Sequence, residues 1–235
     1  MSTRHFAPFA LLLACTSSFA AEARVSLNAA ELKAATVLLH VENNKVSVNG
    51  TQAVFTPAPA SKRLGFEPRV IPIPLDRLAG FAGAKANDIQ SNDVRIELRP
   101  NSLHLVIGFE DKGVEVSSLV GSADMTGISA SIDLVPTDTR SGRRVLFPST
   151  TEFNAKINTS GFLLGGGLVK QQILDTGNQV LATESRSIFN SPRVQDGMEE
   201  AFLIWAGFAT GETWERVRAG SLQIKGGELS FTVEK

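Results

Sequence analysis

The chain has 235 residues, of which 43% are hydrophobic and 20% are charged. This balance is typical of a folded globular protein and excludes a disordered or collagen-like chain. The formal net charge of −1 provides no basic field for the phosphates of nucleic acid, so nucleic acid is not an expected partner.

The first twenty residues have the pattern of a secretory signal peptide. A short polar start precedes a mostly apolar run over 6–15, and the small residues of Ser18-Phe19-Ala20 favour cleavage before Ala21. That run is too short to span a membrane, and a buried N-terminal helix is the alternative interpretation. We therefore expect residues 21–235 to be secreted across the inner membrane into the periplasm, as a single α+β domain.

Cys15 ends the apolar run and offers a second processing route. Leu12-Leu13-Ala14-Cys15 resembles a bacterial lipobox, although Leu13 is unusual at its position, and lipidation of Cys15 would anchor the protein to a membrane. Cleavage before Ala21 is the favoured route. It removes the only cysteine and leaves no thiol nucleophile, disulfide or thiolate metal site. No later stretch is apolar for long enough to predict a transmembrane helix.

Helical signals follow the signal peptide. Asn28 and Glu31 have the spacing of a capping box, which predicts a helix from Ala29 to about Leu39. Residues 37–41 could equally begin a strand.

Strand and loop signals come next. Val46 and Val48, directly before Asn49-Gly50, predict a strand. Five of the ten prolines fall between residues 55 and 75, which predicts a crossing loop of extended character. Residues 75–82 could form a short helix.

The clearest strand signal is a hairpin over residues 93–109. Apolar and polar residues alternate on both sides of Pro100-Asn101, which predicts a two-residue loop. That loop would place every apolar residue on one face, namely Val94, Ile96, Leu98, Leu103, Leu105 and Ile107. On the polar face it would pair Glu97 with His104.

A third pair of alternating segments follows, and its strands are long. Ile128 to Leu134 alternates, residues 136–142 read as a polar turn, and Val145 to Ile157 alternates again. Pro148 interrupts the second segment and predicts a bulge or an edge position. One apolar and one polar face on each strand indicate an antiparallel sheet that is covered on one side.

Two helices are predicted late in the chain. The first runs from Gly167 to about Phe189, and Asn190-Ser191-Pro192 ends it. The second runs from about Val194 to Phe208. Its apolar face is predicted to contain Met198, Ala201, Phe202, Trp205 and Phe208. The second helix is apolar almost all round, which indicates burial or insertion into something apolar.

The last fifteen residues predict a second hairpin around Gly226-Gly227. Its register would set Ile224 against Leu229 and Lys225 against Glu228. Because the chain ends there, we expect this hairpin to close the sheet or to lie near its edge.

Catalytic and metal-binding patterns are not recognisable in the sequence. Gly165-Gly166-Gly167 lacks the lysine of a phosphate-binding loop and reads as a turn before a helix. His104 beside Glu97 could be a base with its orienting acid, but a solvated cross-strand pair is the favoured interpretation. His40 is best explained as a surface histidine at a strand end. We therefore expect no enzyme, no cofactor and no metal.

Aromatic residues are strongly biased towards phenylalanine. The chain has 14 phenylalanines, two tryptophans and no tyrosine, which discourages a sugar-binding surface. Phenylalanine suits either an ordinary core or an apolar groove for acyl chains, and only apolar surface beyond a closed core would separate the two.

The order of these elements resembles the tubular lipid-binding (TULIP) superfamily, in particular its small bacterial secreted and lipoprotein members. Val25-Ser-Leu-Asn-Ala-Ala-Glu-Leu32 opens a helix directly after the signal, long amphipathic strands follow, and helices come late. Gly220-Ser-Leu-Gln-Ile-Lys-Gly-Gly-Glu-Leu-Ser-Phe-Thr-Val233 ends the chain as a hairpin. The resemblance implies an α+β fold in which a long, strongly curved antiparallel sheet packs on one or two long C-terminal helices around an apolar tube.

The sequence thus favours a secreted, non-catalytic protein of the cell envelope that binds or carries a lipid or another long apolar molecule. Burial of acyl chains needs only apolar area. The expected ligand-binding residues are Val94, Ile96, Leu98, Leu103, Leu105, Ile107, Ile173, Phe202 and Trp205. The alternative is a structural or protein-interaction module of the cell envelope with a closed core. The sequence leaves the oligomeric state open.

Overall fold

The computed structural model of the chain describes residues 21–32, 43–75, 80–110, 112–140, 142–162 and 165–235, with the side chains of residues 87 and 88 left aside. The predicted signal peptide, Cys15, His40 and most of the helix predicted from Ala29 lie outside the described residues. Within them the fold is α+β, with a large curved antiparallel sheet and long C-terminal helices, as the sequence predicts.

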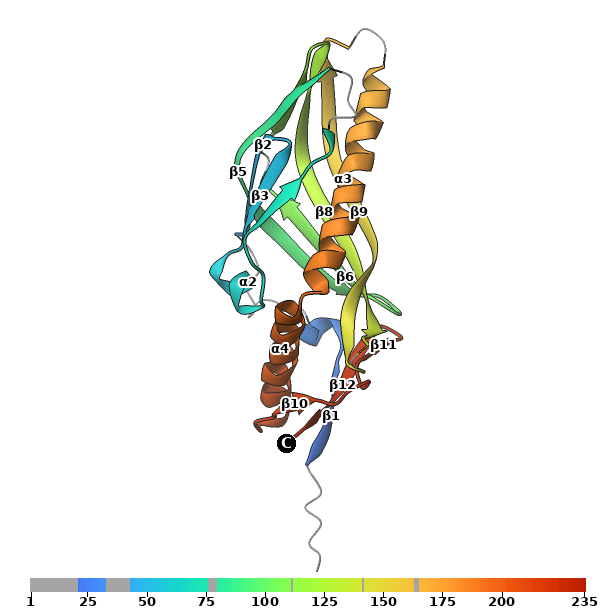
Figure 1. Ribbon diagram of the computed structural model, residues 1–235. Coiled ribbons are helices and arrows are strands. Elements are labelled where there is room, and N and C mark those ends of the chain that lie inside the picture. The colour runs from blue at the N-terminus through green and yellow to red at the C-terminus, as the bar shows by residue number, and fades with distance from the viewer. Residues whose placement is uncertain (1–20, 33–42, 76–79, 111, 141, 163–164) are drawn as a thin grey trace, which may run out of the picture.

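The eight-stranded sheet forms the long upper part of the molecule (Figure 1). Its order is β4-β3-β2-β5-β6-β8-β9, with β7 between β5 and β8 near one end. The strands are β2 (Lys45–Gly50), β3 (Gln52–Thr56), β4 (Arg69–Pro72), β5 (Phe81–Leu98), β6 (Leu103–Phe109), β7 (Val114–Ser118), β8 (Gly121–Asp138) and β9 (Arg144–Ser160). All pairings are antiparallel.

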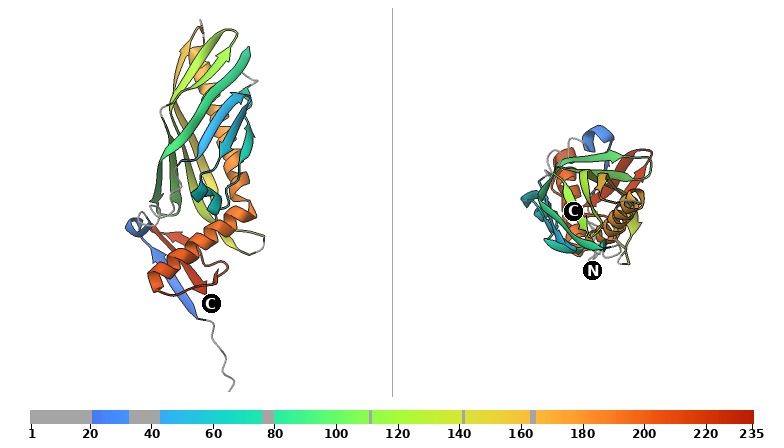
Figure 2. Two further views of the ribbon diagram at one scale, coloured as in Figure 1. Left: turned by 90° about the vertical axis from the view of Figure 1, so that its left-hand side faces the viewer. Right: turned by 90° about the horizontal axis from the view of Figure 1, so that it is seen from above.

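Helix α3 (Gly166–Phe189) closes this sheet into a tube, as the view along the long axis in Figure 2 shows. At the β9 edge, the N–H of Phe153 donates to Oδ1 of Asn178 at 2.8 Å. A Cβ atom at Gly177 would collide with the Phe153 ring, so only glycine lets the helix approach so closely. The contact covers an edge strand whose backbone would otherwise be open to pairing.

The opposite edge of the sheet meets the same helix through polar contacts. Nη1 of Arg69, on β4, lies 3.2 Å from Oε2 of Glu184, and its Nη2 donates to the Ser187 hydroxyl at 3.1 Å. The two edges of the sheet therefore both contact α3, one by close packing and the other by a charged seam.

The lower part of the molecule joins the two ends of the described chain (Figure 1). Its four-stranded sheet has the order β1-β12-β10, and β11 also pairs with β12. The strands are β1 (Glu22–Leu27), β10 (Arg216–Val217), β11 (Gln223–Lys225) and β12 (Glu228–Glu234). Helix α4 (Pro192–Thr210) contributes Phe202, whose ring lies 5.0 Å from that of Phe231 on β12.

Buried apolar residues form two clusters, of which one lies within the upper part and the other joins the lower part to the adjoining end of the tube. The lower cluster comprises Val25, Leu27, Leu103, Ile132, Leu134, Leu146, Phe189, Val194, Ala206, Trp214, Leu222, Ile224, Leu229, Phe231 and Val233. The upper cluster comprises Val48, Ala53, Leu75, Ala84, Ala86, Ile89, Val114, Val116, Ala123, Met125, Ile157 and Ile173.

The local pairings predicted from the sequence are confirmed. Leu98 faces Leu103 across the first hairpin, and Ile224 faces Leu229 across the last. The register shifts between Asp133 and Leu134, where Pro148 lies opposite, so a bulge is present. The break between the late helices also stands, because α3 ends at Phe189 and α4 begins with proline at its first position.

The N-terminal prediction needs one correction. The capping box exists, since the Asn28 side chain accepts from the N–H groups of Ala30 and Glu31 while Glu31 accepts from the N–H of Asn28. However, Val25 to Leu27 is part of strand β1 and not of the helix. Tertiary pairing with β12 decides this, because Val25 faces Phe231 and Leu27 faces Leu229.

Other segments also differ from the prediction. The proline-rich stretch contains β3, a short helix α2 (Pro59–Arg63) and β4, rather than one crossing loop. Phe81 and Ala82 belong to β5 and not to a helix, and β8 continues to Asp138 before the turn. The C-terminal hairpin lies in the separate lower sheet, where β12 is the central strand. Phe208 is 70% exposed and does not share the packed face of α4.

None of the helices within the described residues is both long enough and apolar enough to cross a membrane.

Candidate functional site

The apolar face of the first hairpin is only partly covered. Of its six residues only Leu103 is buried, whereas Val94, Ile96, Leu98, Leu105 and Ile107 are half-buried. Ala130, Ile132 and Leu134 lie on the same face of the neighbouring strand β8 and are all buried. The cover is therefore less complete on β5 and β6 than on this part of β8.

The predicted ligand-binding residues divide between the two clusters. Leu103 belongs to the lower cluster, and Ile96, Leu98, Leu105, Phe202 and Trp205 pack against it. Ile173 belongs to the upper cluster, so the structure does not bring it together with Phe202 and Trp205. Val94 and Ile107 belong to neither cluster.

One row of residues crosses the tube between the two clusters, and we call it the waist row. Val94 pairs with Ile107, Ile107 with Ala130, and Ala130 with Phe153, so the row spans strands β5, β6, β8 and β9. None of the four belongs to either cluster of the described residues, and three of them are half-buried. The waist row thus lies outside both clusters, with Phe153 packed against α3 at Gly177 and with Val94 and Ile107 less completely covered.

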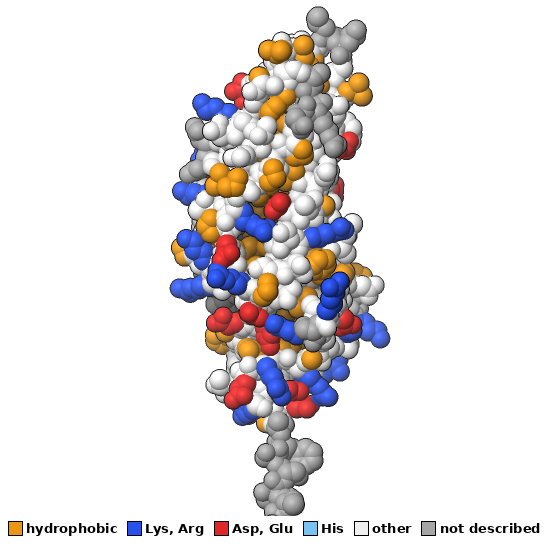
Figure 3. All heavy atoms as spheres, in the orientation of Figure 1, with side chains coloured by type: hydrophobic (Ala, Val, Ile, Leu, Met, Phe, Trp, Pro, Cys, Tyr) orange, Lys and Arg blue, Asp and Glu red, His pale blue; other side chains and the backbone are white. Residues whose placement is uncertain are grey.

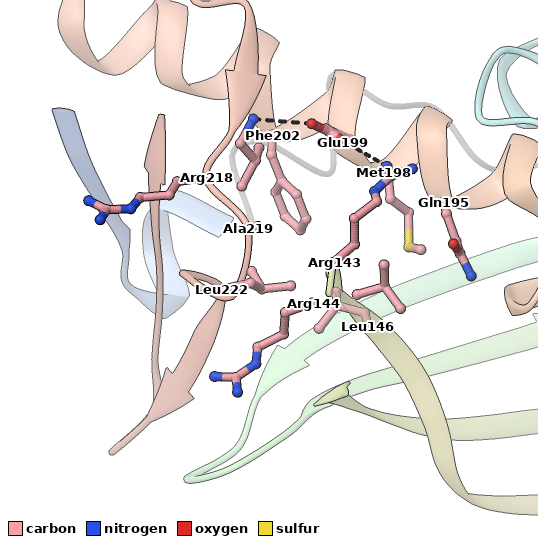
Figure 4. A pocket seen from close by; sticks show the side chains of 12 residues that line it. Arg143, Arg144, Leu146, Gln195, Met198, Glu199, Phe202, Arg218, Ala219 and Leu222 are labelled. Carbon is pink, nitrogen blue, oxygen red and sulfur yellow. Dashed lines mark hydrogen bonds and ion pairs between the residues drawn. The ribbon is translucent and has the colours of Figure 1, made fainter. Parts of the chain in front are cut away.

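A separate small pocket lies at the lower end of the tube, where α4 meets the start of β9 (Figure 4). Leu146, Met198, Phe202 and Leu222 form its apolar walls, and three arginines stand at its rim. Its volume of about 30 Å³ has room for one or two water molecules but not for an acyl chain. Of the predicted ligand-binding residues, Phe202 alone lines it.

The arginines of this pocket already have acidic partners. Nη1 of Arg143 lies 2.9 Å from Oδ1 of Asp196, and its Nη2 also pairs with Glu199. The hydrogen bond to Asp196 is the largest of the causes that raise the pKa of Arg143 above its ordinary value. Arg144 pairs with Asp138 at 2.7 Å. Because these charges are matched, the pocket has little attraction for a further anion.

His104 has a different partner from the one predicted. Glu97 faces His104 in the register of the hairpin, but Nδ1 of His104 lies 2.8 Å from Oδ1 of Asp133 on β8. Asp133 also accepts from Nη1 of Arg99 and from the Thr150 hydroxyl. The His104 side chain is 12% exposed, so it is a covered member of a network and not a solvated pair.

The sequence reasoning included Val94 and Ile107 but missed Ala130 and Phe153, which complete the waist row, and it missed Asp133 for the same reason. Both depend on which strand lies on the far side of β6, and the pairing of β6 with β8 joins segments that a hairpin pattern does not connect. The alternation of 128–134 with polar residues was the available signal, but it does not specify the neighbouring strand.

Metal binding has no support among the residues that the structure describes. They contain no group of three or more histidine, cysteine, aspartate or glutamate side chains placed to hold a metal ion.

Comparison with known proteins does not place the chain in a family. No protein-family model and no curated protein matches the sequence. Among solved structures, a crystal structure of lipopolysaccharide binding protein is similar with a TM-score of 0.38 and 15% identity, over 90% of this chain and 49% of that one. The chain spans about half the length of that protein.

The fold and the site define a structural class. The molecule is an α+β protein in which one long helix closes a curved sheet into a tube, and a second, smaller sheet joins the two ends of the described chain.

Proposed function

We propose that this protein binds or carries a lipid or another long apolar molecule without catalysing a reaction, and that the ligand occupies the tube at the waist row. The observation that supports the proposal is the half-buried apolar surface of Val94 and Ile107, which belong to neither of the two packed clusters. Apolar surface that the fold leaves uncovered is stabilised by contact with an apolar ligand, by about 25 cal/mol per Å².

The charged seam supplies an entry route in this proposal. Along β9 the helix α3 is held by close packing at Gly177 and by a backbone hydrogen bond to Asn178. Along β4 the seam holds α3 through the side chain of Arg69, which can exchange its partners for water. Separation of α3 from β4 is therefore the less costly way to widen the tube, and it would expose the interior beside the waist row.

The proposal includes export to the periplasm and a relationship to tubular lipid-binding proteins, both from the sequence pattern. Lipidation of Cys15 remains an alternative to simple secretion within it. An acyl chain that enters between α3 and β4 makes only apolar contacts at the waist row, which requires none of the charged groups of the chain.

A substitution that fills the waist tests the proposal. Ile107→Trp adds bulk to the waist row, and Val106→Trp adds the same kind of side chain to the opposite face of the same strand. Native mass spectrometry and the binding of a fluorescent fatty acid are measured for the unmodified protein and both variants. We expect Ile107→Trp to abolish binding with little change in the urea midpoint, and Val106→Trp to bind normally.

The alternative function is a structural or protein-interaction module of the cell envelope with a closed core, which the burial of Ala130, Ile132 and Leu134 on the same face favours. In that case the interior is closed, and Ile107→Trp overpacks it at a cost of about 1–3 kcal/mol. The absence of fatty-acid binding by the unmodified protein, together with this loss of stability, would contradict the carrier proposal.

A further inference from the structure

The end of the tube that lies far from the lower sheet is built from three chain segments, which we call the distal tip. They are the start of β5 over 80–83, the turn between β7 and β8 over 117–122, and the junction of β9 with α3 over 159–162 and 165–169. Phe81 pairs with Ser118, and Ser122 pairs with Ser160, so the segments are adjacent (Figure 1).

The distal tip carries no ionisable side chain. None of its residues is Asp, Glu, Lys, Arg or His, in a chain where 20% of residues are charged. In the space-filling view of Figure 3, the very top shows hydrophobic and uncharged groups, a few charged side chains lie below it at the upper left, and most lie over the middle and lower parts. The tip therefore lacks the usual composition of a surface that faces water.

Large apolar side chains project from this uncharged end. Leu119 is 87% exposed, Leu168 is 72% exposed and Val120 is 55% exposed. Single exposed apolar residues are common, but three on neighbouring segments with no charge between them form a patch that indicates a binding surface.

The N–H groups of the turn at the tip have hydrogen-bond partners within the chain. The N–H of Leu119 donates to the carbonyl oxygen of Gly80 at 2.7 Å, and the N–H of Val120 donates to the Ser118 hydroxyl at 3.3 Å. The Ser118 hydroxyl in turn donates to the carbonyl oxygen of Gly121 at 2.9 Å. A turn with these hydrogen bonds can enter a medium of low polarity without the cost of unpaired N–H groups.

Close backbone contacts hold the turn in place. A Cβ atom at Gly121 would collide with the carbonyl oxygen of Ser160 and with the Phe162 ring, and Gly161 has a φ of +80° beside Gly121. The turn is thereby fixed against the end of β9, so its two apolar side chains project from a fixed support.

We propose that the distal tip docks on a lipid bilayer by inserting Leu119, Val120 and Leu168 into the interfacial region. A bilayer fits these observations better than a protein partner does. The described tip has no Trp, Tyr or Arg, the residues that dominate protein–protein hot spots, and its turn pairs its own N–H groups. This inference is independent of ligand binding at the waist row, since it concerns the outer surface at one end of the tube.

Vesicle binding tests the inference. The full chain, purified as exported, is sedimented with vesicles of phosphatidylethanolamine and phosphatidylglycerol. Leu119→Asp and Leu168→Asp are compared with Phe208→Asp, which places the same charge at an exposed apolar position on α4, at the far end of the molecule. We expect each tip variant to lose about tenfold or more in vesicle affinity, because an inserted leucine is replaced by a charge. The control variant should bind normally.

A second measurement locates the tip in the membrane. Tryptophan in Leu119→Trp should shift its emission to the blue on addition of vesicles, and brominated lipids should quench it, while Phe208→Trp should not respond. Binding carried by apolar insertion should also persist at high salt. Unchanged sedimentation of both tip variants together with an unshifted emission at position 119 overturns the inference. The inference is also overturned if the tip variants bind vesicles normally but lose a self-associated state that the unmodified protein forms. Fatty-acid binding is measured on the same samples, so that a failure of the proposed ligand binding at the waist row is distinguished from a failure of membrane docking.

Discussion

The lower cluster and the tube bury apolar residues to different extents. Among the described residues, the large apolar side chains that are almost completely buried all belong to the lower cluster. They are Phe231, Leu27, Leu222, Leu229, Val194 and Val233. The upper cluster contains four alanines and no phenylalanine, and the waist row below it is incompletely covered. The largest fully buried side chains therefore lie in the lower cluster, whereas the waist row is less completely covered.

The largest expected effect concerns the lower cluster. Phe231→Ala removes a fully buried ring and its contact with Phe202, which should reduce the free energy of unfolding by about 3–5 kcal/mol. Phe208→Ala, at an exposed position of α4, is the matched control and should change it by less than about 0.5 kcal/mol. Urea denaturation measures both. If both substitutions change the free energy of unfolding by the same amount, burial in the lower cluster does not provide the expected stability.

Overpacking sharpens the comparison. Ile132→Trp inserts bulk into the lower cluster and should cost about 1–3 kcal/mol. Ile107→Trp lies on the neighbouring strand of the same face but in the waist row, and should cost clearly less. The urea midpoints of the two variants are compared directly. If Ile107→Trp proves as destabilising as Ile132→Trp, the waist is packed as densely as the lower cluster.

The closure of the tube by α3 predicts a smaller effect. Gly177→Val forces a side chain into the Phe153 ring, which should cost about 1 kcal/mol or more from overpacking. Gly167→Val is the control in the same helix, because a Cβ atom there meets nothing within 4 Å. Thermal unfolding measures both. A larger loss for the control than for Gly177→Val would show that α3 is not closely packed on β9.

The smallest effect is a pH dependence at the junction of the two parts. The hydrogen bond from Arg144 holds the pKa of Asp138 below its ordinary value. A carboxyl whose pKa is lower in the folded state stabilises the fold above its unfolded pKa, and this contribution is lost as the pH falls through the folded pKa. Asp138→Asn should therefore lose stability slightly at neutral pH and match the unmodified protein in acid. Urea midpoints at the two pH values measure this difference, and a difference that persists in acid would contradict it.

Much of the local structure could be predicted from the sequence. The hairpin at Pro100-Asn101, the capping box at Asn28 and the boundaries of α3 depend on residues close together in the chain, and all three are present in the structure. The candidate site could be predicted only in part. The apolar face of the first hairpin has the predicted pairing, but Ile173 belongs to the upper cluster while Phe202 packs against the lower one.

The sequence by itself determined the alternation of each strand, the registers of its hairpins and the helix ends, because a two-residue loop or a cap acts over a few residues. Only the tertiary structure decided that β1 pairs with β12 and that β6 lies beside β8. It also decided that α3 closes the sheet and that His104 binds Asp133. These outcomes depend on contacts between distant segments, where the burial of whole faces outweighs any local preference.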